Sequence, residues 1–161
     1  MERILTIDDF EALAIGAGIL GTGGGGNPYL AKIRAIQYLK EGIDIKLVDF
    51  DAVPDNALVV SVGGMGAPTV GIERIARGDE TYRAMLGLEN YLGRKFTHVI
   101  AGEIGGGNAI APMIVAAQSG LPVIDGDGMG RAFPELQMDT FMIAGIPPSP
   151  AVLADHLEHV T

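Results

Sequence analysis

Residues 97–137 constrain the fold of this chain more than any other stretch. One apolar run ends at Gly102, a helix-like run covers 109–119, and a second apolar run ends at 125–126. Short apolar runs bounded by glycine predict buried strands. Gly120 and Pro122 predict the end of the helix between them. The stretch therefore predicts a strand, helix, strand unit, whose two strands run parallel in one sheet.

Parallel strands place the loops that follow them at one edge of the sheet, where open α/β sheets bind ligands. Asn108 is expected to be the N-cap of the helix over 109–118. We expect the polar side chains of both loops to converge on one site. They are Glu103, Asn108, Asp125, Asp127, Arg131 and Glu135. The alternative is that the glycines only make turns and the acids only cap helices.

The rest of the chain predicts more elements of the same kind. Apolar spacing and capping signals indicate helices over 7–20, 29–40 and 79–92, and strands over 45–48, 57–62 and 140–144. Together they predict an α/β fold, with a mostly parallel sheet flanked by helices in Rossmann-like layers. A length of 161 residues fits a single domain, which we place at 1–146.

Glycine runs follow several of these elements. The overlapping G-x-G-x-x-G matches in 16–26 do not predict a dinucleotide site, because a helix and not a strand precedes them. Gly21–Asn27 leads into a helix with Pro28 at its first position, an arrangement that suits an anion. A flexible connector is the alternative. The groups expected to bind a substrate come from this loop and from the two loops within residues 97–137. They are Asn108, Arg131, Glu135, Gly105, Gly106, Gly128, Gly24 and Asn27.

Composition excludes several classes of protein. The net charge is −9, so nucleic-acid binding is not expected. The chain has no cysteine, shows no signal-peptide pattern at its start and has no apolar run of membrane-spanning length. We therefore expect a cytoplasmic protein without a membrane partner. The mean hydropathy of +0.31 indicates a face buried against another copy or against a second domain.

Carboxylates are the best candidates for chemistry. Glu103, Asp125 and Asp127 are expected to be catalytic, because clustered acids can exchange protons with a substrate or orient a water. The same three could hold a divalent metal, although no cofactor is certain. The Asp-x-Asp pattern at 125–127 is not the start of an EF-hand, since position twelve is Leu136. Residues 147–161 read as a Pro-rich linker and tail toward an absent C-terminal domain.

Four motifs together resemble the N-terminal domain of the S-methyl thiohydantoin desulfurase family, which is associated with hydantoinase and oxoprolinase proteins. They are residues 21–28, 63–68, 103–108 and 125–135. The resemblance implies hydrolytic removal of a sulfur group from a five-membered thiohydantoin ring, giving a hydantoin and a thiol. It also implies a small-molecule substrate and a second, C-terminal domain.

Two other hypotheses on the function stay open. The chain could be a non-catalytic binding or assembly module of a larger enzyme, because it contains no complete nucleophile and base set. It could also bind a nucleotide, which the absence of a proper fingerprint disfavours.

Overall fold

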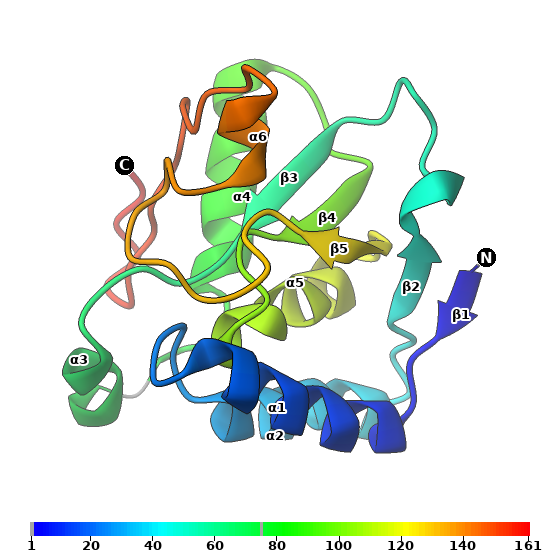
Figure 1. Ribbon diagram of the computed structural model, residues 1–161, viewed down its shortest axis with the longest axis vertical. Helices are drawn as coiled ribbons and strands as arrows, with labels where there is room; N and C mark the ends of the chain where they lie inside the picture. The colour runs from blue at the N-terminus through cyan, green and yellow to red at the C-terminus, as the bar shows by residue number, and fades with distance from the viewer. Residues whose placement is uncertain (1, 75) are drawn as a thin grey trace.

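The computed structural model describes residues 2–74 and 76–161 and shows a five-stranded sheet in the order β1-β2-β5-β4-β3 (Figure 1). β1 runs antiparallel to β2, and the other neighbours are parallel. The strands are β1 (Glu2–Ile4), β2 (Lys46–Asp49), β3 (Val59–Val62), β4 (His98–Ala101) and β5 (Val123–Asp127). The α-helices are α1 (Ile7–Gly21), α2 (Pro28–Lys40), α3 (Pro68–Glu73), α4 (Glu80–Leu92), α5 (Ala111–Ser119) and α6 (Thr140–Ile143). The structure also contains the short 3-10 helices η1 (Phe50–Ala52) and η2 (Gly106–Ala109). The α/β fold with a mostly parallel sheet is thus confirmed.

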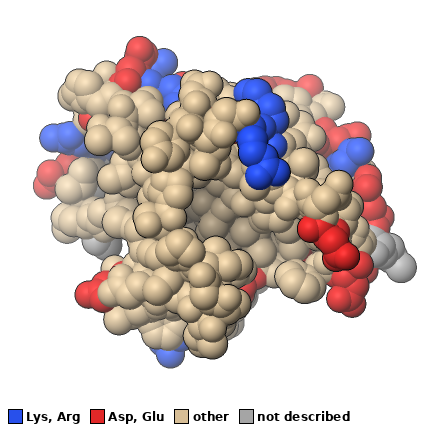
Figure 2. Space-filling view, turned by 90° about the horizontal axis from the view of Figure 1, so that it is seen from above, with Lys and Arg blue, Asp and Glu red and all other residues tan. Residues whose placement is uncertain are grey.

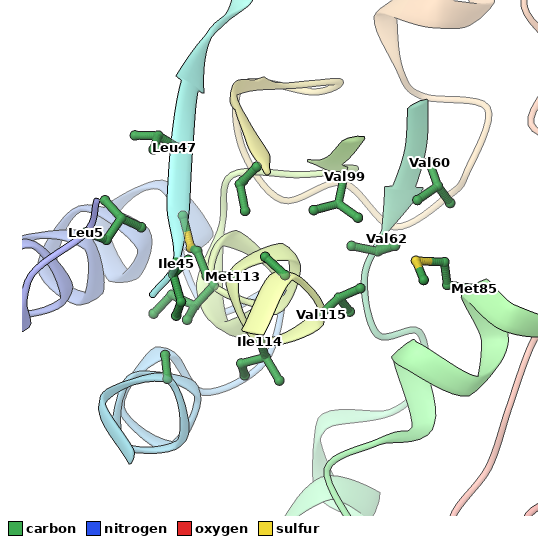
Figure 3. Packing of buried hydrophobic residues seen from close by; sticks show 14 of the residues in the cluster. Leu5, Ile45, Leu47, Val60, Val62, Met85, Val99, Met113, Ile114 and Val115 are labelled. Carbon is green, nitrogen blue, oxygen red and sulfur yellow. The ribbon is translucent and has the colours of Figure 1, made fainter. Parts of the chain in front are cut away.

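The main core lies between the sheet and α5. Val60, Val62 and Val99 point from the strands toward Met113 and Val115 of α5 (Figure 3). All five are at most 7% exposed. The helix α2 packs on the far side of α5, and α1 packs beside α2. The sheet therefore has two layers of helix on this face.

The opposite face of the sheet is covered more thinly. A small buried cluster of Val48, Ile100 and Ile124 packs there against Phe141 of the short helix α6. Seen from above, the molecule is hollowed near its centre and the surface around the hollow is largely uncharged (Figure 2). Helices thus flank both faces, but the long ones lie on one.

Three predictions about local structure were wrong. Residues 140–143 form the helix α6 and not a strand, because Asp139 caps it by accepting from the Met142 N–H at 2.9 Å. Asn108 is not the N-cap of α5, which begins at Ala111 after the 3-10 turn η2. β5 continues to Asp127, so both acids of 125–127 lie in the strand and not in the loop after it.

Residues 151–161 form no helix and pack against α4 (Figure 1). A Cβ at Gly87 of α4 would lie 2.8 Å from Val160 Cγ1 and 3.0 Å from Val152 Cγ1. Arg83 donates to the carbonyl of Asp155, and Arg77 pairs with Glu158. The absence of a side chain at position 87 therefore lets the end of the chain lie directly on this helix.

The start of α1 is a capping box. The Thr6 hydroxyl accepts from the Asp9 N–H at 3.3 Å, and the Thr6 N–H donates to Asp9 Oδ2 at 2.7 Å. Arg3 also donates to Asp9 Oδ1 at 2.8 Å. The hydrogen bond from Arg3, followed by those from Thr6, lowers the pKa of Asp9 from 3.8 to about 2. The ionised form of Asp9 therefore stabilises the folded state.

We expect Asp9→Ala to lower the free energy of unfolding by about 1 kcal/mol at pH 7, since the carboxylate is partly exposed. The pKa of Asp9 is depressed in the folded state, so its contribution is complete above the unfolded pKa of 3.8 and declines as the pH falls toward about 2. Urea unfolding of both proteins at pH 7, 4 and 3 measures this. A difference that grows as the pH falls would contradict the assignment.

Candidate functional site

Four glycine-rich loops meet at the carboxyl edge of the sheet: 22–27, 63–67, 102–108 and 128–135 (Figure 1). The Asn108 N–H donates to the Gly25 carbonyl at 2.9 Å, and the Gly107 N–H donates to the Gly26 carbonyl at 3.1 Å. A Cβ at Gly106 would lie 2.4 Å from the Gly24 carbonyl oxygen. The first and third loops are therefore in backbone contact, with no room for a side chain between them.

The side chain of Asn108 joins the third loop to the second. Its Oδ1 accepts from the Gly64 N–H at 2.7 Å, and its Nδ2 donates to the Gly64 carbonyl at 2.8 Å. The same Nδ2 donates to Glu103 Oε1 at 2.7 Å. Asn108 thus holds a backbone segment 44 residues away and orients the carboxylate of Glu103.

Glu103 joins the third loop to the fourth. It is 9% exposed, and its Oε2 accepts from the Phe133 N–H at 3.0 Å. A buried carboxylate is strongly unfavourable unless it is hydrogen-bonded. Here both oxygens have a donor, one from a side chain and one from the backbone. Glu103 is therefore at the centre of the loop cluster, and its position is fixed from two sides.

Asp127 holds the start of the fourth loop. Its Oδ2 accepts from the N–H groups of Ile104, Met129 and Gly130, at 3.1, 2.9 and 2.6 Å. Ile104 directly follows Glu103, so the loops after β4 and β5 are neighbours, as the sequence predicted. The carboxylate of Asp127 is thus engaged with the backbone, and its arrangement resembles a turn-stabilising aspartate.

Asp125 lies in a different environment. It is exposed and lines a pocket of about 80 Å³ between β2, β5, α1 and α5. Arg3 of β1 lines the same pocket, and its side chain also donates to Asp9. The remaining walls are mostly apolar, with Leu47 and Met113 among them. Asp125 is the predicted acid that a small ligand could touch.

A larger hollow of about 500 Å³ lies beside α6. Met129, Phe133, Met138 and Met142 give it apolar walls, and Thr140 is among its polar groups. Neither Glu103, Asp125 nor Asp127 lines it. This larger hollow and the predicted catalytic acids are therefore separate parts of the same edge.

The other predicted binding residues differ in their contacts and in their exposure to solvent. Arg131 donates to the Thr22 hydroxyl at 3.3 Å and lies over the ring of Phe133, so it bridges the first and fourth loops. Glu135 is exposed and accepts from Gln137. Asn27 caps α2 by accepting from the Tyr29 N–H at 2.9 Å. The oxygen of Asn27 is thus occupied by the helix.

The predicted glycines serve close packing. A Cβ at Gly24 would lie 3.0 Å from Ala132 Cβ, one at Gly105 would lie 2.7 Å from the Ala132 nitrogen, and one at Gly128 would lie 3.0 Å from the Gly102 carbonyl oxygen. A side chain at Gly105 would overlap the backbone of Ala132, whereas one at Gly24 or Gly128 would make a contact that is tighter than normal. Within residues 2–74 and 76–161, no group of three acids or histidines is arranged to hold a metal ion.

A family model described as S-Me-THD-like, N-terminal domain, matches residues 8–161. The chain belongs to this family. The S-Me-THD-like domain also resembles a crystal structure of a protein from Chromobacterium violaceum, with 33% sequence identity and a TM-score of 0.78. That match covers 99% of this chain and 44% of the other, so the chain spans less than half the length of this relative. A comparison with curated proteins found no match.

Some contacts of the candidate site were not predicted from the sequence. Arg3 reaches the Asp125 pocket because β1 pairs with β2, which in turn pairs with β5. The backbone of Gly64 pairs with Asn108, and the N–H of Phe133 reaches Glu103. The glycine run at 63–66 was a signal for the contact between Gly64 and Asn108. No local pattern pointed to Arg3.

Among the helices of residues 2–74 and 76–161, none combines the length and the apolar composition that crossing a membrane requires.

Proposed function

We propose that this S-Me-THD-like domain takes part in the hydrolysis of a small hydantoin- or thiohydantoin-like ring. The observation that supports it is the meeting of four glycine loops around the buried Glu103–Asn108 pair, in a chain of this family. In the reaction, water adds to the ring carbon that bears the S-methyl group. One proton of the water goes to the ring nitrogen that was double-bonded to this carbon. The carbon–sulfur bond then breaks, methanethiol leaves with the other proton, and the carbon becomes a carbonyl.

In this proposal Asp125 is the group that contacts the substrate. It is exposed at a pocket of small volume, and Arg3, which lines the same pocket, can donate to a ring oxygen. A carboxylate so placed could accept a proton from the attacking water. Glu103 and Asp127 act by fixing the loops, since their oxygens already accept from backbone or amide N–H groups.

We expect Asp125→Asn to lower the rate of methanethiol release from an S-methyl thiohydantoin by at least about 100-fold, the usual contribution of a general base. Asp51→Asn, at an exposed position on η1, is the matched control and should leave the rate unchanged. A thiol reagent can follow the product directly, because the chain has no cysteine to react with it. An Asp125→Asn variant with the wild-type rate would remove this residue from the mechanism.

A second function is a non-catalytic binding or assembly module of a larger enzyme. It is favoured by the engagement of Glu103 and Asp127 with the backbone, which leaves these acids in structural roles. Such a module would be stabilised by the S-methyl thiohydantoin in a thermal unfolding experiment without releasing methanethiol. Stabilisation together with release supports the first function.

A further inference from the structure

The helices α1 and α2 form the lowest layer of the molecule in Figure 1. Several of their large apolar side chains are exposed. On α1, Ile15 and Ile19 are 68% and 69% exposed. On α2, Tyr29, Leu30 and Ile33 are 58%, 58% and 48% exposed. We refer to these five residues as the outer helix face. Isolated exposed apolar residues are ordinary, but five on one helix pair form a patch.

The sequence of α1 is unusual for a helix with an open side. From Ala12 to Gly21 it contains no polar residue. Its inner side is already used, because Phe10 and Ala17 are buried. A helix that is apolar on all sides is normally buried on all sides. The composition of α1 therefore predicts that its outer side, which is exposed in the single chain, is buried against another molecule or segment.

The outer helix face is large enough for a specific contact. With about 200 Å² for each fully exposed large side chain, the exposed fractions give roughly 600 Å² of apolar surface. A standard interface buries about 800 Å² on each partner, with a polar rim around an apolar centre. Glu11 and Lys32, which pair at 2.7 Å beside this face, would provide part of such a rim without burying an unpaired charge.

The face also has the shape to pack against itself. Ile15 and Ile19 are four residues apart and form a ridge along α1. The adjacent row of side chains on α1 contains the small residues Ala12 and Gly16. Outside the neighbouring residues of the helix, no atom lies within 4 Å of a Cβ placed on Gly16. A ridge beside an open groove on one helix fits the same pair on a second helix, turned by a two-fold rotation.

We propose that the outer helix face binds a second copy of this chain and forms a two-fold dimer in which α1 packs on α1 of the partner. The ridge of Ile15 and Ile19 enters the groove above Gly16 of the other copy. Tyr29, Leu30 and Ile33 of α2 close the sides of this contact. This inference is independent of the proposed reaction, because none of the residues used here lines the Asp125 pocket.

Sedimentation equilibrium of the wild-type chain over 1 µM to 1 mM tests the proposal. We expect a monomer–dimer equilibrium between 16.8 kDa and twice that mass, with half of the chain dimeric below about 100 µM. Salt should favour the dimer, since it screens the repulsion between two chains that each carry a net charge of −9. A chain that sediments as a monomer throughout would overturn the proposal and leave the face to a different partner.

Two variants locate the contact. Ile15→Glu places a charge on an exposed ridge and should weaken dimerisation by at least 10-fold. Gly16→Leu fills the groove, and a Cβ at this position meets no atom within 4 Å outside the neighbouring residues of the helix, so the variant should weaken the dimer while the fold is kept. Ile143→Glu is the control, because Ile143 is 88% exposed on α6, far from both helices. Unchanged dimerisation of both α1 variants, or loss of the dimer only in Ile143→Glu, would also overturn it.

Discussion

Gly25→Ala is expected to destabilise the domain by at least about 3 kcal/mol, which is in the range of severe packing defects. A Cβ at Gly25 would lie 2.0 Å from the Gly105 carbonyl oxygen and 2.7 Å from the Gly105 carbonyl carbon. Backbone atoms cannot rotate away as a side chain can. The two loops would therefore have to separate, and the hydrogen bond from the Asn108 N–H to the Gly25 carbonyl would be lost with them.

The neighbouring Gly26 provides a control with a similar φ angle. Its φ is +83°, against +74° at Gly25, but a Cβ there would meet no atom within 4 Å. Gly26→Ala should thus show only the effect of the left-handed conformation, about 1 kcal/mol. Urea unfolding of the three proteins measures the difference. Equal destabilisation by the two substitutions would mean that the loops are not in contact as described.

Glu103→Gln is expected to lower the free energy of unfolding by about 2–3 kcal/mol, although the two side chains have nearly the same shape. The carboxylate accepts from Asn108 Nδ2 and from the Phe133 N–H. Glutamine has one accepting oxygen, so one of these donors would face an amide NH₂ and remain unsatisfied. An unpaired buried donor costs about 1–3 kcal/mol, and hydrogen bonds to a charged group are stronger than neutral ones.

Glu135→Gln is the matched control for Glu103→Gln. Glu135 is exposed in the same loop region, where its side chain contacts Gln137, and its substitution should change stability by less than about 0.5 kcal/mol. Hydrogen exchange of the Phe133 N–H gives a second measurement. Its protection should fall in Glu103→Gln and be retained in Glu135→Gln. Wild-type stability and protection in both variants would show that Glu103 does not hold the fourth loop.

The elements that could be predicted are those with a local signal. The capping box at Thr6 and Asp9 fixes the start of α1, Asn27 and Pro28 fix the start of α2, and Gly120 ends α5 with a φ of +76°. Each signal acts within one turn of helix, so three to five residues suffice to read it. The order of strands and helices followed from these signals and from the apolar runs between them.

The roles of the polar residues depended on contacts between distant segments. Asn108 has the residue type of an N-cap, but Gly64, 44 residues away, offers its side chain two hydrogen bonds in addition to the one with Glu103. The run at 140–143 has the composition of a strand. The cap at Asp139 and the packing of Phe141 against the sheet favour a helix instead. Tertiary contacts decided both cases against the local preference.

The sequence by itself determined the α/β class, the parallel strand pair around α5 and the meeting of the glycine loops at one edge, because strand ends and turns are encoded by neighbouring residues. Only the tertiary structure decided which acids accept hydrogen bonds from the backbone and which one stays exposed. It placed Glu103 and Asp127 against backbone N–H groups and left Asp125 exposed at a pocket that Arg3 of the first strand also lines. The reason is physical: a carboxylate is held by whichever donors the fold brings within about 3 Å, and those donors come from segments that no local pattern connects.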